Sequence, residues 1–450
     1  MRLTVLSHDR KDRDLSSADA DTAFLQIYRY GERGEKIPFD KFIWILNPWT
    51  GDREKELYEQ LGPIYGESSA PRRWQDTLHI FLKADGWVPV YNSPSDWYHP
   101  KFDMRLFVWV DDLLLDAPKD GSSEAFYKRL QKGHKTAKGI KIKPVEYLTK
   151  ETPLDHVGLK ISLTDTHICI SMGYYVDKII AAADMVDCQI ASTPINAEIT
   201  DLEPLGIKDA SFVREINGMA GWLANTTRPD IAYTCSRIAQ HNAKPCEGAL
   251  KAVKYLVRYL AGTRNLGLRA DLDRASADFK FFVDADHAGN SEPQNERRSQ
   301  LSHVMMTGTG VFAWKSSTTT SARANQHFDQ TSTAQSSGEA EIFAYSEATK
   351  AMLHMSYIAE ELHIPNWPKP MLLQCDATTA LAFAENRGTP TRLKHLDVRQ
   401  AWILQLRDTS QIIGIKVDTL LNKADLSTKM HPPHKFKTLI EGLLFEIIIK

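Results

Sequence analysis

The segment LFVWVDDLLL, from Leu106 to Leu115, restricts the fold of this chain more than any other segment. Two apolar runs flank the adjacent acids Asp111 and Asp112, which predicts two strands of a hairpin with both carboxylates at its turn. Neighbouring carboxylates repel each other unless a cation compensates them. The pattern therefore indicates either a cation-binding hairpin or a solvated acidic turn.

Composition narrows the class of protein and its compartment. The chain has 450 residues, of which 42% are hydrophobic and 25% charged, as in globular proteins of two to four domains. Its net charge is only -2, so any surface that binds nucleic acid must be local. Five scattered cysteines without a C-x-x-C pair argue against a disulfide framework and a zinc site. We expect an intracellular protein, cytoplasmic or nuclear, without a signal peptide or transmembrane segment.

The pattern of periodicity changes along the chain. A mixed segment ends near residue 200 in a proline-containing stretch that predicts a boundary, and a helical segment continues to about residue 275. In this segment an apolar stripe at helical spacing comprises Leu250, Val253, Leu256, Val257 and Leu260. From about Phe279 the order is strand, strands, long helix, strand and further helices around a late strand. This order predicts an α/β layer, and the whole chain a combination of α/β and α+β domains.

The long helix places one glutamate on its apolar face. Its stripe consists of Ala344, Ala348, Ala351, Met355, Ile358 and Leu362. Extended backward by three residues, the stripe reaches Glu341, whose burial would be costly unless it were paired or bound a metal. Glu339 points away from the stripe and has a structural explanation, since Ser336 and Glu339 form a capping-box pattern.

Three aspartates complete a candidate metal site with Glu341. Asp284 and Asp376 each come where an apolar strand ends, and Asp425 comes after the late strand. Carboxylates at strand ends that face an inward-pointing glutamate suit a divalent cation. Each aspartate has an alternative role, namely a solvated strand end for Asp284 and a helix cap for Asp376 and Asp425.

The motifs of this half occur in the order typical of one family. FVDADHAG, SSGEAEI, LQCD, KHLDV and KADLSTK resemble the ribonuclease H domain of copia-type LTR retrotransposon Pol polyproteins. This resemblance implies that Asp284, Glu341, Asp376 and Asp425 hold two magnesium ions, with Asp397 as the second choice for the fourth ligand. It also implies hydrolysis of RNA in an RNA/DNA hybrid.

The upstream half resembles the reverse transcriptase of the same polyproteins. The motifs are DADTAFLQ, IYGESSAPRRW, WVDD, CISMGYYVDKIIAAADMVDCQIASTPI, NTTRPDIAYT and YLAGTRNLGL. The resemblance implies a polymerase palm in which Asp19 and Asp111 bind two magnesium ions and Asp112 supports them. Phe24 resembles the residue that excludes a ribose 2′-hydroxyl, with a plain core aromatic as the alternative. The implied partners are template-primer nucleic acid and a deoxynucleoside triphosphate, and a homodimer is a further expectation.

Basic residues predict local contacts with nucleic acid. The segment from Lys128 to Lys143 has seven Lys and Arg residues and no acid, which suits phosphate contacts. Its candidate residues are Lys128, Arg129, Lys132 and Lys135, with a solvated helix face as the alternative. Arg72 and Arg73 match a family position near template and nucleotide, with a surface arginine pair beside a core Trp74 as the alternative.

The resemblance also predicts the domain boundaries and which activity to expect. Residues 1–200 are expected to form the palm, 201–275 a helical thumb and connection, and 276–435 a ribonuclease H-like α/β domain. From the resemblance we expect this chain to lack the fingers segment that precedes the palm in the family. Ser69 stands where the family usually has a glutamine, and Trp109 where it has a tyrosine, so we expect hybrid cleavage more than DNA synthesis. Two alternatives are an inactive remnant that binds nucleic acid and a resolvase- or exonuclease-like nuclease.

Overall fold

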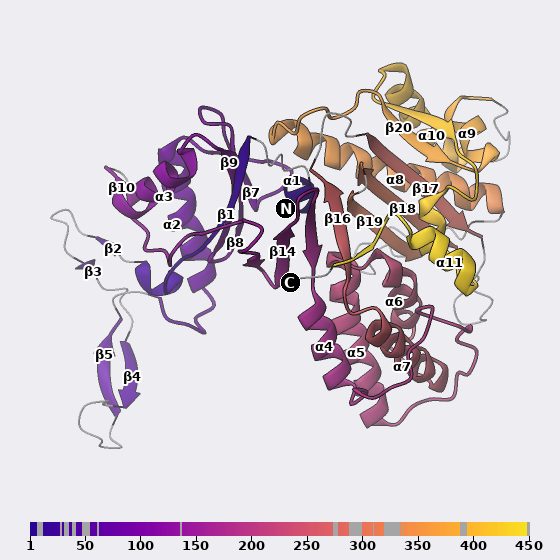
Figure 1. Ribbon diagram of the computed structural model, residues 1–450, viewed down its shortest axis with the longest axis horizontal. Helices are drawn as coiled ribbons and strands as arrows, with labels where there is room; N and C mark the ends of the chain where they lie inside the picture. The colour runs from indigo at the N-terminus through magenta and orange to yellow at the C-terminus, as the bar shows by residue number, and fades with distance from the viewer. Residues whose placement is uncertain are drawn as a thin grey trace. The chain divides into compact units, whose positions relative to one another are not determined.

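A computed structural model of the chain contains two compact units (Figure 1). The first comprises Met1 and Arg10–Val157, and the second Arg2–Asp9 and Gly158–Lys450. The structure describes residues 1–6, 12–27, 29–30, 36–37, 42–46, 55–60, 63–135, 137–272, 278–287, 299–308, 310–318, 334, 336–387 and 394–447. In these residues no helix is both long enough and apolar enough to cross a membrane.

The first unit is built on a six-stranded antiparallel sheet. In spatial order its strands are β12 (Glu146–Tyr147), β1 (Arg13–Asp19), β9 (Asp112–Pro118), β8 (Met104–Trp109), β7 (Asp96–His99) and β6 (Val88–Pro89). Helices α2 (Ala70–Asp85) and α3 (Ser122–Lys132) pack on it (Figure 1). Side chains alternate along β9, so that Leu113 and Leu115 join the core with Phe126 of α3. The predicted hairpin is confirmed as β8 and β9.

Short elements complete the first unit. They are η1 (Ala23–Gln26), the pair β2 (Arg29–Tyr30) and β3 (Lys36–Ile37), the pair β4 (Phe42–Leu46) and β5 (Lys55–Glu59), the pair β10 (Gly133–His134) and β11 (Ala137–Lys138), and β13 (Leu154–His156).

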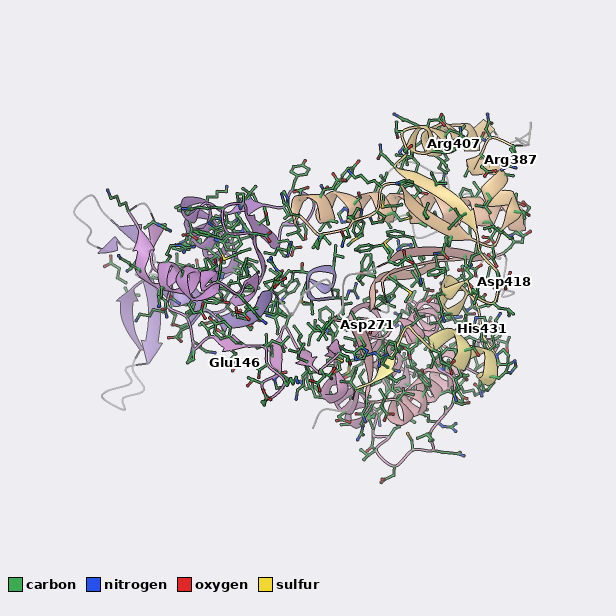
Figure 2. All side chains as sticks on the ribbon, turned by 45° about the horizontal axis from the view of Figure 1, so that its top comes forward. Glu146, Asp271, Arg387, Arg407, Asp418 and His431 are labelled. Carbon is green, nitrogen blue, oxygen red and sulfur yellow. The ribbon has the colours of Figure 1, made fainter. Side chains whose placement is uncertain are left out.

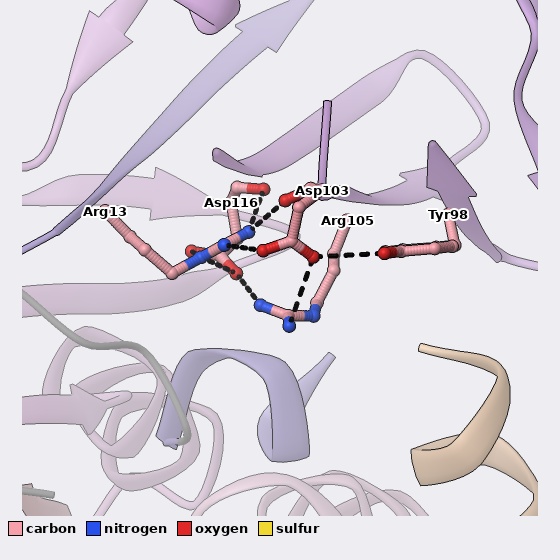
Figure 3. Close-up of polar contacts among 5 residues, drawn as sticks. All are labelled: Arg13, Tyr98, Asp103, Arg105 and Asp116. Atoms are coloured by element: carbon pink, nitrogen blue, oxygen red, sulfur yellow. Dashed lines mark hydrogen bonds and ion pairs between the residues drawn. The ribbon is translucent and has the colours of Figure 1, made fainter. Parts of the chain in front are cut away.

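An ion-pair cluster joins β1, β8 and β9 (Figure 3). The Asp116 carboxylate accepts hydrogen bonds from Arg13 Nε at 2.9 Å and Arg105 Nη1 at 2.8 Å. Arg13 also binds Asp103 at 2.6 Å, and the Tyr98 hydroxyl donates to Asp103 at 3.2 Å. The Asp116 side chain is only 1% exposed. Its buried negative charge is compensated by the guanidinium groups of Arg13 and Arg105, which come from the two neighbouring strands.

The second unit contains an antiparallel layer and a helical layer. The strands are β14 (Leu159–Leu163), β15 (His167–Ser171), β16 (Leu266–Asp271) and β22 (Phe445–Glu446). The helical elements are α1 (Arg2–Leu6), α4 (Gly173–Ala182), α5 (Ile207–Thr226), η2 (Pro229–Ile231), α6 (Ala232–Ala239) and α7 (Glu247–Gly262). The predicted stripe on α7 is confirmed, since all five of its residues are buried.

The boundary between the two compact units differs from the boundary that we predict near residue 200. The first unit ends at Val157. The reason is that β15 pairs with β16 and α4 packs against α5 and α7, so the segment from 158 to 200 belongs to the second unit.

A five-stranded mixed sheet forms the rest of the second unit. Its order is β19 (Gly310–Thr318), β18 (Gln300–Thr307), β17 (Phe279–Asp286), β20 (Met371–Cys375) and β21 (Ile412–Lys416). The first three strands are antiparallel, and β20 and β21 continue the sheet parallel to β17. Around it lie α8 (Ser337–Glu361), α9 (Thr378–Ala384), α10 (Lys394–Asp408), η4 (Lys423–Ser427) and α11 (Pro433–Ile440).

The mixed sheet and its helices confirm the order of strands and helices predicted after Phe279. The long helix begins after Ser336, whose side chain accepts a hydrogen bond from the backbone N–H of Glu339 at 3.2 Å, as the capping pattern predicts. The polar tract that we expect to be a loop, from 317 to 336, falls almost wholly outside the described residues.

Candidate functional site

Two aspartates lie side by side on parallel strands of the mixed sheet. Val283 of β17 is opposite Cys375 of β20, so the next residues along each strand, Asp284 and Asp376, are neighbours. The expectation that Asp284 ends its strand needs correction, because β17 continues through Asp286, which pairs with Gln300 of β18. Asp284 is therefore buried within the sheet, with 4% of its surface exposed.

Helix α8 brings Glu341 to these aspartates. Burial, followed by the charges of Asp284 and Asp376, raises the pKa of Glu341 to about 8. Its Oε2 atom is buried without a hydrogen-bond partner. A buried carboxylate in such surroundings favours either a proton or a bound cation. Glu341 thus lies near Asp284 and Asp376, as predicted.

Burial alone does not separate Glu341 from Glu339. Glu339 is 3% exposed and hence more buried than Glu341, whereas Ala351 and Met355 of the predicted stripe are only half-buried. The single-stripe interpretation of α8 needs this correction because the helix packs against β17 and β18 and also against α9 and α10. What distinguishes Glu341 is the neighbouring carboxylates.

Asp284 is held by the segment around η4. The Thr428 hydroxyl donates a hydrogen bond to Asp284 Oδ2 at 2.6 Å. Burial raises the pKa of Asp284 to about 7, with contributions from Asp425 and Asp376, although the Thr428 hydrogen bond acts in the opposite direction. Asn422 donates to the backbone oxygen of Val283 at 3.0 Å and to Asp376 Oδ1 at 3.1 Å, so it ties β17 to β20.

Asp425, the predicted fourth ligand, has two ammonium partners. Lys429 Nζ lies 2.5 Å from Asp425 Oδ1, and Lys435 Nζ lies 2.7 Å from Oδ2. Burial alone would raise the pKa of Asp425, but the two ammonium groups outweigh it and keep this pKa below its ordinary value. These contacts are ion pairs, since neither Asp425 oxygen has a hydrogen-bond partner of good geometry. His431, labelled in Figure 2, donates from Nε2 to the Asp425 backbone oxygen at 2.8 Å. The Asp397 side chain lies outside the described residues.

The structure adds three residues that we do not predict from the sequence. Asp286 shares the face of β17 with Asp284, and burial raises its pKa; the two-residue alternation in FVDAD could have indicated it. Asn422 carries no comparable signal. Burial alone would lower the pKa of Lys429, but its contact with Asp425 and the charge of Asp284 raise it above its ordinary value.

The chemistry of this set suits a hard divalent cation. Asp284, Glu341 and Asp376 supply carboxylate oxygens, the ligands that Mg²⁺ prefers, and Glu341 has a buried oxygen with no hydrogen bond. Within the described ranges, no three acidic, His or Cys side chains already stand where they could hold one ion. The three carboxylates would therefore have to converge when an ion binds.

The raised pKa values predict a pH dependence of stability. The pKa of Asp284 is about 7 and that of Glu341 about 8, so the folded chain retains protons that the unfolded chain has lost. Stability without metal should therefore fall as pH rises from about 4 to about 8, which thermal unfolding in EDTA would measure. Added Mg²⁺ should restore more stability at about pH 8.5 than at about pH 6, since it binds deprotonated carboxylates. A Glu341→Gln variant that kept the full pH slope would contradict this prediction.

The first unit carries a second group of carboxylates. Asp19 at the end of β1 is opposite Asp112 at the start of β9, and Asp111 lies in the turn before it. Burial, followed by the charges of Asp111 and Asp19, raises the pKa of Asp112 to about 6. The charge of Lys143 lowers this pKa, and Lys143 binds Asp19 Oδ2 at 2.8 Å. The three predicted acids are therefore brought together.

The turn that presents Asp111 is held from two sides. Val110 has a φ of 55°, a left-handed conformation that is strained for a β-branched residue. Its backbone oxygen accepts a hydrogen bond from Trp74 Nε1 at 2.5 Å, and the Asp111 oxygen accepts one from Ala20 N–H at 2.8 Å. Strain of this kind persists where surrounding contacts over-determine the backbone, often at functional sites.

The predicted nucleotide-contacting residues have mixed surroundings. Phe24 is half-buried, and its ring centroid lies 5.1 Å from that of the exposed Tyr65. Arg72 is exposed and pairs with Asp76 at 3.1 Å, while Trp74 is 1% exposed. This arrangement fits the alternative of a surface arginine beside a core tryptophan. Arg73 is half-buried.

The predicted basic track lies partly on α3. Lys128, Lys132 and Lys135 are exposed, as phosphate contacts require. Arg129 instead makes a 2.6 Å ion pair with the buried Asp85, so it has a structural task in this unit. The role of these residues toward nucleic acid stays a prediction.

The chain has homologues among retrotransposon proteins. It is 25% identical over 441 residues to the Retrovirus-related Pol polyprotein from transposon TNT 1-94 of Nicotiana tabacum, which covers 95% of this chain and 30% of that polyprotein. It is 25% identical over 387 residues to the Pol polyprotein from transposon RE1 of Arabidopsis thaliana, covering 84% of this chain and 24% of the relative. These homologues are copia-type Pol polyproteins, and the chain spans less than a third of their length. No family model matches the chain.

Solved structures of viral proteins also align with most of the chain. A foamy viral protease-reverse transcriptase in complex with double-stranded DNA has a TM-score of 0.48 and 13% identity, covering 93% of this chain and 59% of that one. The same kind of protein in complex with an RNA/DNA hybrid has a TM-score of 0.47 and 13% identity, covering 96% and 47%.

Proposed function

We propose that this chain is the reverse transcriptase and ribonuclease H region of a copia-type retrotransposon Pol polyprotein. In this proposal the six-stranded sheet of the first unit is the palm, the helices α4 to α7 belong to the thumb and connection, and the mixed sheet is the ribonuclease H domain. The homologous polyproteins support the assignment to this family. The acidic cluster in each unit supports a candidate metal site there.

The reaction that the second unit supports best is magnesium-dependent hydrolysis of the RNA strand of an RNA/DNA hybrid. The observation that carries it is that β17, α8 and β20 bring the carboxylates of Asp284, Glu341 and Asp376 near enough to influence one another. These residues would hold Mg²⁺, which when bound lowers the pKa of a water molecule and stabilises charge on the phosphate oxygens. Thr428 and Asn422 orient Asp284 and Asp376 through their hydrogen bonds.

The test of this proposal is cleavage of a labelled RNA/DNA hybrid by the purified chain, with Mg²⁺ and with EDTA. Cleavage that requires the metal would support it. Salt-sensitive hybrid binding without cleavage would instead support an inactive remnant that binds nucleic acid through its exposed lysines.

RNA-directed DNA synthesis is a second candidate function, carried by the register of Asp19 opposite Asp112 with Asp111 in the intervening turn. If it occurs, the Asp111→Asn variant should lose primer extension by about a thousandfold, because a metal-binding carboxylate typically supplies several kcal/mol of transition-state stabilisation. Extension of a labelled primer on an RNA template measures this. Hybrid cleavage by the same variant should be unchanged, since its candidate site is in the other unit. Equal extension by the variant and the parent chain would remove Asp111 from the site.

A further inference from the structure

Two lysines contact Asp425, one of the four acids predicted to bind metal in the second unit. A metal site formed by acids alone does not require these lysines. Asp425 has one negative charge, and Lys429 and Lys435 bring two positive charges within 2.7 Å of its oxygens. The group thus has a net charge of +1 rather than -1. An anion that is already overcompensated attracts a further divalent cation poorly.

The Asp425 carboxylate is also enclosed. Its side chain is 1% exposed, its backbone oxygen is bonded to His431, and the next turn is fixed by Thr428. To bind a metal ion, Asp425 would have to give up a 2.5 Å ion pair in which its own carboxylate is buried. Removing a partner from such a pair is costly.

Lys429 is the lysine that faces the other acids. Lys429 follows directly after Thr428, whose hydroxyl bonds Asp284 at 2.6 Å. Its charge acts on Asp284, Glu341 and Asp286, whereas that of Lys435 acts on Asp425 and His431. The Lys429 side chain is 39% exposed, so its ammonium can also be reached from solvent by a phosphate. Lys429 therefore lies near the carboxylates and is also open to solvent.

We propose that Asp425 is not a metal ligand in this chain, and that it holds Lys429 as a fixed second cation beside a single divalent ion bound by Asp284, Glu341 and Asp376. This inference rests on the proposed hydrolysis and deepens it. The Lys429 ammonium takes the position of charge that a second ion would otherwise provide, and it contacts a non-bridging oxygen of the phosphate. Lys429 is then a catalytic residue and Asp425 a positioning residue.

The experiment counts bound Mn²⁺ by electron paramagnetic resonance, for the whole chain alone and with a hybrid whose RNA strand carries 2′-O-methyl groups that block cleavage. We expect one ion per chain in both cases. Glu341→Gln should weaken binding of this ion by well over ~100-fold, and Asp425→Asn by only about tenfold, the lower end of the range for residues outside the ligand set. The double variant Lys429→Met/Lys435→Met should bind a second ion, since Asp425 is then uncompensated.

The matched control is Lys435→Met alone, which changes the same carboxylate but leaves Lys429 in place and should still bind one ion. Circular dichroism and thermal unfolding establish that each variant is folded. Two ions bound by the parent chain, or an Asp425→Asn effect as large as that of Glu341→Gln, would overturn the inference. If the chain binds one ion but does not cleave the hybrid, this inference stands and the proposed hydrolysis is rejected. If it binds two ions and cleaves the hybrid, the hydrolysis stands and this inference is rejected.

Discussion

The Glu341→Gln variant should cleave an RNA/DNA hybrid about a thousandfold more slowly than the parent chain, because losing a ligand costs several kcal/mol of transition-state stabilisation. Glutamine keeps the shape of the side chain and removes the negative charge that faces Asp284 and Asp376. The measurement is single-turnover cleavage of a labelled hybrid in saturating Mg²⁺. The effect should appear in the rate of cleavage more than in the affinity for the hybrid.

The control for this variant lies on the same helix. Glu347 is 43% exposed and pairs with Lys350 at 2.7 Å, so Glu347→Gln makes the same chemical change away from the carboxylates. It should cleave within about twofold of the parent chain, as expected for a surface pair worth at most about 1 kcal/mol. Similar rates for Glu341→Gln and Glu347→Gln would show that the metal-dependent site is elsewhere.

Local patterns in the sequence predict the elements and part of the sites well. Apolar runs on both sides of Asp111 and Asp112 predict the β8 and β9 hairpin. The three-and-four spacing leads back to Glu341, which does lie near Asp284, although Glu339 on the same helix is more buried. Both inferences use residues close in the sequence, where the periodicity of one element determines which side chains share a face.

Long-range pairing is what the sequence does not reveal. Lys435 reaches Asp425 from the next helix, and only the folded path of α11 brings it there. The residues from 158 to 200 likewise resemble the end of the first unit in sequence, but their strand and helix pair with later segments. Neither arrangement has a periodic signature, because both depend on contacts between elements.

The Asp116→Asn variant should lose about 3–5 kcal/mol of the stability of the first unit, since removing one partner of a buried ion pair leaves the other charges uncompensated. Arg13 and Arg105, with side chains 11% and 6% exposed, would lose a carboxylate that is 1% exposed, and the charge of Asp103 near them is 50% exposed. Hydrogen exchange measured on peptides from β1, β8 and β9 reports this loss locally, as a full-chain unfolding curve of two units would not. The control Asp76→Asn breaks the exposed pair with Arg72 and should cost less than about 1 kcal/mol.

The same variant separates the two candidate sites. Asp116 is opposite Leu15 on β1, four residues along β9 from the Asp112 and Asp19 pair, so loosening this pairing should also disturb the carboxylates of the first unit. Primer extension, if the chain has it, should then fall together with exchange protection. Hybrid cleavage should persist, because Asp284, Glu341 and Asp376 are held by a sheet in the other compact unit. Unchanged protection of β1 and β9 would mean that the cluster in Figure 3 contributes little to the stability of this sheet.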